Sequence, residues 1–251
     1  MELVDRKAIE TAYAREIGRV FAAQRRLFED RFAESPEIPE ETWEDDRKEI
    51  TEVMLLFGLT IALLSFIQHG GSPLTSDDPA FDSAAADSLA KTLAKVRPRP
   101  QGFNPLDTGP PAALRGGITE RATEIAGDIV AHSRDLLRDF QGRIESEPES
   151  VNVRDISHRI YGPHRAAVIA TTETTRGQHF GSETAVAGTV GISQDDLWFT
   201  VRDRRVCPVC EPLHGRPRSY WGRFYAIGPP DPHAVCRCYI QYANLGEGVQ
   251  P

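Results

Sequence analysis

The sequence predicts an α+β protein in which a mainly α-helical first part is followed by a small, zinc-stabilised α+β tail. In the first 150 residues, apolar side chains recur every three or four positions over long stretches, the pattern of amphipathic helices. All four cysteines lie in the last fifth of the chain, between Cys207 and Cys238. A chain of 251 residues with 40% hydrophobic residues can bury a core in one or two domains. We therefore expect a helical region at 1–150 and a tail domain at 151–251.

Two long helices are expected at the start of the chain. Apolar residues recur at helical spacing over Arg6–Phe32, and the prolines Pro36 and Pro39 end this stretch. A second helix should start near Pro39, pass through the apolar run Met54–Phe66 and end at Gly70-Gly71. That run is shorter than the ~20 residues needed to span a bilayer. We expect a core helix, or one that docks on a partner, and no membrane contact.

The middle of the chain should contain two more helices separated by a linker. Ser83–Val96 has the length of a short helix and stops before a proline. Residues 97–117 contain five prolines and four glycines, with Pro110-Pro111 at the centre, which predicts a linker or an extended surface strap. Helical periodicity resumes over Ile118–Ile144.

The tail should combine helices with short strands. Asn152 or Asp155 has the character of a helix cap, and the short helix that it starts should lead into a helix at Ala166–Gly177. Alternating side chains predict strands at Leu197–Arg202 and Cys236–Tyr242. The tail is therefore expected to be α+β, with zinc joining the ends of the strands.

The cysteines have the spacing of a metal site. A Cys-x2-Cys turn aims two sulfurs at one point, and a second close-set group must complete the tetrahedron that Zn²⁺ prefers. The candidate ligands are Cys207, Cys210, His233, Cys236 and Cys238. Five candidates compete for four positions, and His214 would be a sixth. The preferred set is Cys207, Cys210, His233 and Cys236, with Cys238 either replacing His233 or lying outside the set.

The alternative to a metal site is two disulfides or four free thiols. Disulfides require an oxidising compartment, and the start of the chain, Met1–Arg6, has no apolar signal region. A ligand set rich in cysteine leaves no open position for water, so a zinc ion here would be structural and not catalytic. Close-set thiolates repel one another, so metal binding would be coupled to folding of the tail.

The tail contains, in chain order, the helix Ala166–Gly177, the strand Leu197–Val201 with its Trp, the run Asp203–Cys210, His214-Gly215, and Pro229-Pro230 leading to His233-x-x-Cys236-Arg237-Cys238. Together these motifs resemble the carboxy-terminal domain of the phage Mu F-like minor head proteins, also called the phage head morphogenesis family. The resemblance covers about a third of the chain, from Ile160 to Tyr242. Pro229-Pro230 is separated from His233 by two residues where that family usually has one, and Ala234 replaces a usual proline.

This resemblance implies a phage or prophage minor head protein that acts in head assembly, DNA packaging or genome ejection. The helical first part would attach to the portal or the inner capsid, and the tail would face the head interior, with packaged DNA as a further partner. Such a protein is located in the virion, at the capsid interior or portal vertex, and in the host cytoplasm during assembly. It has no chemistry of its own and no small-molecule substrate.

Charge is unevenly distributed along the chain, whose net charge is −8. Residues 1–50 hold 14 Asp/Glu against 9 Lys/Arg, whereas residues 201–240 hold 7 Arg against 3 Asp/Glu. An acidic first part and a basic tail are able to meet different partners, such as a protein ring and DNA. Ordinary solvated faces explain the same pattern, because seven arginines do not establish a phosphate-binding track.

No enzyme signature is found, and we predict no catalytic residues. The candidate acid and base groups are Glu173, Asp203, His164, His179 and His214. Glu173 can simply pair with Arg176 one helical turn later. The sequence lacks a phosphate-binding Gly-rich loop, a Gly-x-Ser-x-Gly motif and a His-Glu-x-x-His motif. The enzymatic alternative is an ADP-ribosyltransferase-like or nuclease domain that uses Glu173.

A third reading makes the tail a zinc-dependent DNA-binding module. Its binding would weaken steeply with salt, and replacement of Arg218 in an exposed loop should lower DNA affinity while assembly survives. The loop from Glu211 to Pro232 is rich in aromatic residues for an exposed segment. It either packs over the metal site or forms a binding surface.

Overall fold

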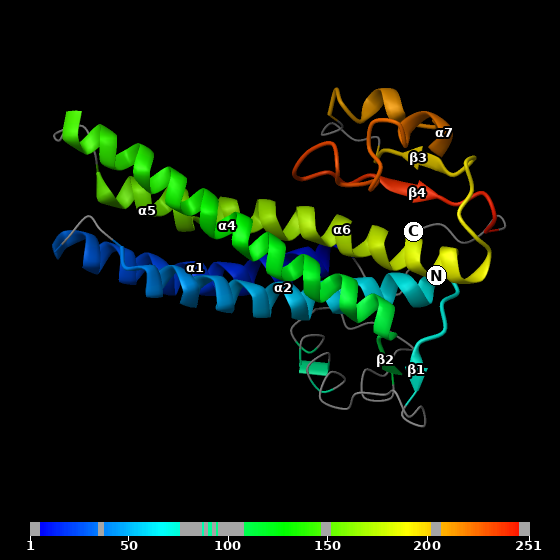
Figure 1. Ribbon diagram of the computed structural model, residues 1–251, viewed down its shortest axis with the longest axis horizontal. Helices are drawn as coiled ribbons and strands as arrows, with labels where there is room; N and C mark the ends of the chain where they lie inside the picture. Colours follow the sequence, from blue (N-terminus) through cyan, green and yellow to red (C-terminus); the bar gives the residue numbers. More distant parts are fainter. Residues whose placement is uncertain are drawn as a thin grey trace.

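The computed structural model describes residues 6–34, 38–75, 108–146, 152–201 and 207–245, together with Asp87, Ala90, Lys91 and Ala94. Within these ranges the chain is mostly helical and carries two small antiparallel sheets, which confirms the α+β class. The helix predicted at Ser83–Val96 falls largely outside the described residues. Long helices form an elongated bundle, and the tail with β3 and β4 lies along one side of it (Figure 1).

The first two helices of the bundle are α1 (Arg6–Glu34) and α2 (Glu40–Gln68). Both predictions are confirmed, with ends that differ by one to three residues. The apolar stripe of each helix is buried within the bundle, and where the two helices touch, the rings of Tyr13 and Phe57 stack with centroids 4.7 Å apart. The sequence pattern predicted both helices because a helix that buries one stripe keeps a strict spacing of three to four residues between its apolar positions.

Helix α2 is long and apolar enough to cross a membrane by length and composition alone. In this fold, however, 67% of its most apolar 18-residue window is buried inside the protein. Helices α4 (Ala112–Ser146) and α6 (Pro163–Thr189) both pack against it (Figure 1). Packing within the bundle therefore covers most of the apolar run that includes Met54–Phe66.

Helix α4 starts six residues earlier than predicted, so the linker assignment is wrong for residues 112–117. The prolines before it are compatible with a helix start, because the first turn has no partner for their missing N–H groups. The Arg115 N–H already donates to the Pro111 carbonyl, at 3.0 Å. Gly117 lies against α6, where a Cβ would come within 2.3 Å of the Phe180 ring. Residues 97–107 lie outside the described part of the chain.

Two residues of β1 (Leu74–Thr75) pair antiparallel with β2 (Thr108–Gly109) and bring the end of α2 next to the start of α4. Helix α5 (Val153–Tyr161) follows α4. Of the two residues predicted as helix caps, Asn152 is the one that caps α5. Its side chain accepts a hydrogen bond from the Arg154 N–H at 2.9 Å.

Helix α6 runs twelve residues beyond the predicted end at Gly177. Glycine weakens an isolated helix, but Gly177 and Gly181 of α6 face α2 at close range. A Cβ at Gly181 would lie 2.1 Å from the Ala62 carbonyl oxygen. Glycine at this position allows the backbones of α6 and α2 to touch. The helix therefore continues past Gly177, where the sequence suggested that it ends.

Besides a cluster that joins the second half of α2 and the start of α4 to Ala185 of α6, two apolar cores meet along α6. The larger one is built from α1, α2, α4, α5 and the first half of α6, including Ile160 and Ala170. The smaller core belongs to the tail and includes Val186 from the second half of α6. The division of the chain at residue 150 stays a prediction, and within the described residues α5 and α6 share the core of the preceding helices.

The tail contains β3 (Leu197–Phe199) and β4 (Tyr239–Gln241), which pair antiparallel with Trp198 opposite Ile240. Both strands are shorter than predicted. The Thr200 N–H donates to the ring of His214 at 3.2 Å instead of to a strand. The Cys236 carbonyl accepts from the Thr175 hydroxyl of α6. Side-chain partners thus end each ladder early.

Candidate metal centre

The structure brings all five predicted ligands together in two overlapping groups. The first group is Cys207, Cys210 and His233, and the second is Cys210, Cys236 and Cys238. In each group the ligand atoms lie within 4.8 Å of one another. Cys210 belongs to both, so the two loops that carry the predicted ligands converge on its sulfur.

The Cys-x2-Cys turn leads into the 3₁₀-helix η2 (Glu211–Leu213). The Glu211 N–H donates to the Cys207 carbonyl at 3.0 Å, which closes the turn. The Cys210 N–H points at the Cys207 sulfur, 3.2 Å away. A backbone N–H that donates to sulfur stabilises negative charge on it, as a thiolate ligand requires.

His233 presents one ring nitrogen to this turn. Its Nε2 lies 2.9 Å from the sulfur of Cys207 and 2.9 Å from that of Cys210. The other nitrogen, Nδ1, lies 2.6 Å from the Ala234 carbonyl oxygen. A proton on Nδ1 would be donated to this carbonyl, which leaves the lone pair of Nε2 directed at the two sulfurs.

Helix α6 positions the second cysteine pair. Val235 has φ of 61° and turns the chain back toward the helix. Its N–H donates to the Thr172 hydroxyl at 2.8 Å, and the next carbonyl, of Cys236, accepts from Thr175. These contacts hold the Cys236 sulfur 3.9 Å from the Cys210 sulfur.

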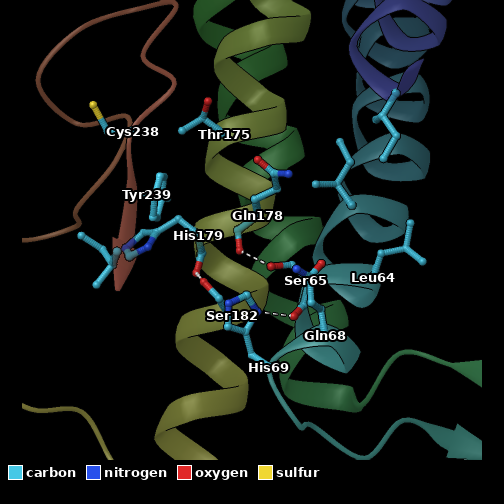
Figure 2. Close-up of a pocket in the computed structure, with 13 residues that line it drawn as sticks. Leu64, Ser65, Gln68, His69, Thr175, Gln178, His179, Ser182, Cys238 and Tyr239 are labelled. Atoms are coloured by element: carbon cyan, nitrogen blue, oxygen red, sulfur yellow. Dashed lines mark hydrogen bonds between the residues drawn. The ribbon is translucent and has the colours of Figure 1, made fainter. Parts of the chain in front are cut away.

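Cys238 is buried and lies at the junction of the tail with the bundle. It borders a small cavity of about 60 Å³ between α2, α6 and β4, in which His179 and His69 also take part (Figure 2). Its place in the second group leaves both roles that the sequence suggested open: replacement of His233, or a position outside the set.

The close sulfurs perturb one another strongly. Contact with the S–H groups of Cys210 and Cys238 lowers the pKa of Cys236 to about 3. The same contact, seen from Cys210, raises the pKa of that thiol far above its usual range. For Cys238, contact with Cys210 lowers the pKa, but contact with Cys236 and burial outweigh this and raise it to about 12. One thiolate is therefore stabilised by its neighbours at neutral pH.

The donor set fits a soft divalent cation. The four cysteines are free thiols, and the 3.9 Å between the sulfurs of Cys210 and Cys236 is well beyond the roughly 2.05 Å of a disulfide. Sulfurs bound to one tetrahedral zinc, each at about 2.3 Å, are spaced roughly 3.8 Å apart. The observed spacing between the sulfurs of Cys210 and Cys236 matches this value.

Comparison with known proteins adds no relative. No family model, no curated protein and no solved structure matches the chain. The function of the protein must therefore be inferred from its own residues.

The remaining histidine candidates lie outside both groups. His214 contacts the Thr200 hydroxyl through Nδ1 at 3.0 Å and packs edge-on against Phe199. His164 is exposed at the start of α6. His179 is buried, which lowers its pKa, and its Nε2 lies 3.8 Å from a Glu183 carboxylate oxygen.

The carboxylates considered for catalysis have structural partners or lie outside the described residues. Glu173 forms an ion pair with Arg176, as predicted, and is nearly fully buried. Burial raises the pKa of Glu173, and the Arg176 guanidinium opposes this rise. Asp203 belongs to the undescribed segment 202–206.

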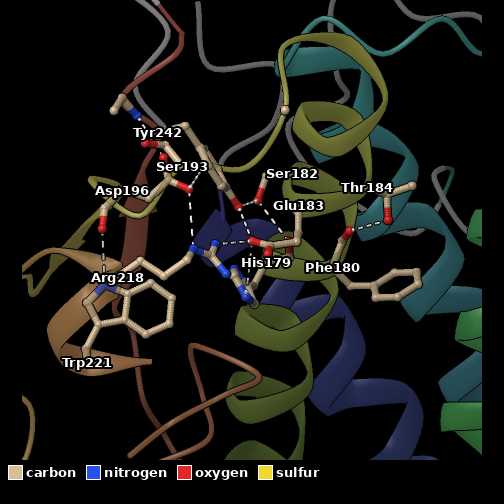
Figure 3. A network of polar contacts seen from close by, with 12 residues as sticks. His179, Phe180, Ser182, Glu183, Thr184, Ser193, Asp196, Arg218, Trp221 and Tyr242 are labelled. Carbon is tan, nitrogen blue, oxygen red and sulfur yellow. Dashed lines mark hydrogen bonds and ion pairs between the residues drawn. The ribbon is translucent and has the colours of Figure 1, made fainter. Parts of the chain in front are cut away.

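The expectation that Arg218 is exposed is wrong. Only 12% of its side chain is accessible, and it lies 2.8 Å from a Glu183 oxygen and 3.4 Å from an Asp196 oxygen. Asp196 is fully buried and also accepts backbone N–H groups from Ser193 and Ala243, at 3.1 and 3.0 Å. Figure 3 shows this network between α6 and the tail. No spacing motif in the sequence indicated it, because its members lie far apart in the chain.

The aromatic loop divides between the two roles that the sequence left open. Trp221, at the end of α7 (Arg218–Trp221), is fully buried against Trp198, in the same core as three of the cysteines. Phe224 and Tyr220 are 64% and 41% exposed. One part of the loop therefore packs beside the Cys/His cluster, and another part faces solvent.

Proposed function

We propose that this protein is a phage or prophage minor head protein of the Mu F-like kind, with a tail stabilised by one structural zinc ion. The observation that carries the proposal is the convergence of Cys207, Cys210, His233, Cys236 and Cys238. The same residues form the most specific motifs of the resemblance in the tail. A chance match of motifs gives no reason for residues from two distant loops to form two groups that share Cys210.

Cys207, Cys210, His233 and Cys236 are the preferred zinc ligands, with Cys238 as the alternative to His233. Bound zinc would supply a cross-link between the loop after β3 and the segment before β4, and no chemistry. Because Val235 and Cys236 are hydrogen-bonded to α6, this cross-link would also fasten the tail to the helical bundle.

The partners in this proposal are the portal or the inner capsid, and packaged DNA. The elongated helical bundle supports attachment to a protein ring, since it offers long side-by-side helices over much of the molecule (Figure 1). The protein would reside in the virion, at the capsid interior or portal vertex, and in the host cytoplasm during assembly. Neither a membrane nor a small-molecule substrate is part of this role.

The zinc assignment is tested by elemental mass spectrometry of the purified protein. We expect one zinc per native chain and none in Cys207→Ser. The matched control is Val209→Ser, which changes an exposed residue between the two cysteines and should keep the metal. Absence of metal from the native chain, with its thiols joined as disulfides, would contradict the assignment.

The assembly role is tested by co-expression with the portal and major capsid proteins encoded in the same genome. We expect a few copies of the chain in each particle, and none when α1 is deleted. Normal assembly and DNA content without the chain, or its exclusion from particles, would contradict the role. Assays of NAD⁺ cleavage and nuclease activity on the native chain and on Glu173→Gln separate the enzymatic alternative, for which only the native chain should be active.

A further inference from the structure

A second concave site lies on the side of α6 toward α4. It is a pocket of about 480 Å³ between the first turns of α4, the middle of α6 and the loop 226–231. This volume is in the range of sites that hold a small molecule or a few side chains of a partner. We call it the α4/α6 pocket. None of the predicted metal ligands lines it.

The walls of the α4/α6 pocket are largely apolar. Ile118, Phe180, Ile227 and Pro230 line it, and the glycine at position 117 makes room for the Phe180 ring. The Ile227 side chain is 65% exposed, the highest exposure of any large apolar residue in the described chain. An isoleucine held this open at the edge of a pocket is a surface that a partner can cover.

The charges around the pocket do not balance. The arginines in its lining are already paired: Arg121 with Glu124, and Arg176 with Glu173. Glu183, which also lines the pocket, is paired with Arg218. These contacts leave little net charge of their own.

Two further carboxylates border the pocket, Glu120 from α4 and Asp231 from the loop after Ile227. Both are exposed, and neither forms an ion pair within the part of the chain that the structure describes. Burial lowers the pKa of His179, so this residue adds no positive charge near neutral pH. The unbalanced charge at the rim is negative, which repels nucleic acid and attracts cations.

We propose that the α4/α6 pocket docks a short segment of another protein in which a basic side chain lies next to an apolar one. The apolar side chain would cover Ile227 and enter the pocket. The lysine or arginine would pair with Glu120 or Asp231. Such a docking site would serve any function of the chain, including that of a minor head protein.

The test uses two synthetic hexapeptides, with blocked ends, titrated into the full-length protein and followed by NMR. One peptide has the sequence GKLLKG and the other, GELLEG, has the same apolar side chains with opposite charge. We expect GKLLKG to shift the signals of Ile118, Phe180 and Ile227. In the double variant Glu120→Gln/Asp231→Asn its affinity should fall at least fivefold. Equal binding of the two peptides, or binding of neither, would overturn the proposal.

The matched control is Asp128→Asn/Asp139→Asn, which removes the same charge from exposed positions elsewhere on α4. This control should bind GKLLKG like the native chain; an equal loss in both double variants would reduce the effect to net charge and sink the site. Ile227→Ser should weaken binding without unfolding the protein, because the side chain is exposed. Self-association in sedimentation that is lost in Ile227→Ser would make a second copy of this chain the occupant, against the proposal.

Discussion

The helical bundle and the tail are held together in different ways. The bundle core draws apolar residues from five helices, whereas the tail core consists of Val186, Trp198, Cys210, Leu213, Trp221, Cys236, Cys238, Ile240 and Tyr242. Three of these nine are cysteines, and each tail strand has only three residues. So small a core gives little stability without cross-links. The comparison teaches that burial stabilises the bundle, while the tail depends on particular polar and sulfur contacts.

The largest difference between the two regions should follow loss of the proposed zinc ion. Cys210→Ser removes the sulfur shared by both ligand groups, and structural zinc sites contribute about 10 kcal/mol in small domains. In a Trp43→Phe background, tryptophan fluorescence reports on the tail through Trp198 and Trp221. We expect this signal to become that of solvent-exposed tryptophan, while far-UV circular dichroism retains the helical bundle.

Cys238→Ser is the comparison for Cys210→Ser. If Cys238 lies outside the ligand set, this variant keeps its zinc and its tryptophan signal. Equal loss of metal in the two variants would place Cys238 in the ligand set. Loss of bundle helicity together with the tryptophan signal would show that the bundle depends on the metal as much as the tail does.

The bundle contains a buried carboxylate, Asp46 of α2, which destabilises the folded state when it is ionised. Burial raises its pKa to about 7; hydrogen bonds with Tyr161 of α5 and Gln24 of α1 oppose the rise, and the neighbouring carboxylates Glu49 and Asp45 add to it. Because the folded state holds this proton more tightly than the unfolded state, the contribution of Asp46 to stability is greatest below about pH 4 and is lost as the pH rises to 7.

Asp46→Asn should therefore stabilise the protein progressively between pH 4 and pH 7, by up to about 4 kcal/mol, since each pKa unit corresponds to about 1.4 kcal/mol. Urea unfolding followed by circular dichroism, at pH 5 and pH 8, measures the difference between variant and native chain. A difference that is the same at both pH values would mean that Asp46 titrates normally.

Arg218→Ala should destabilise the tail by about 3 kcal/mol, because it leaves the buried Asp196 and the half-buried Glu183 without their counter-charge. The loss should be visible as a lower unfolding midpoint of the tryptophan signal, with the helical signal of the bundle less affected. Arg216→Ala is the matched control, since Arg216 is exposed. An unchanged midpoint in Arg218→Ala would show that the network in Figure 3 contributes no stability.

The smallest effect is expected where α6 contacts the loop that carries Cys236. Thr175→Val removes the hydroxyl that donates to the Cys236 carbonyl, and one such bond contributes about 1 kcal/mol. Zinc affinity, measured by competition with a chelator, should fall severalfold. Thr184→Val, whose hydroxyl donates within its own helix to Phe180, should leave the affinity unchanged. Equal affinities in all three proteins would show that α6 does not position the cysteine pair.

Sequence patterns were reliable where one local rule decides the structure. Apolar spacing predicted α1 and α2 nearly to their ends, and the preference of asparagine for helix starts made Asn152 one of two candidate caps, of which the structure has Asn152. Strand lengths were overestimated, because alternation does not reveal that Thr200 has a side-chain partner in His214.

The sequence by itself determined the helical stripes and the order and spacing of the five candidate ligands, because these depend on residues close together in the chain. Only the tertiary structure decided that the two ligand loops converge on Cys210, that Gly177 lies against α2 instead of ending a helix, and that Arg218 lies largely covered between Glu183 and Asp196. These outcomes depend on which distant surfaces meet. Local spacing carries no information on that, because packing between whole helices and loops sets it.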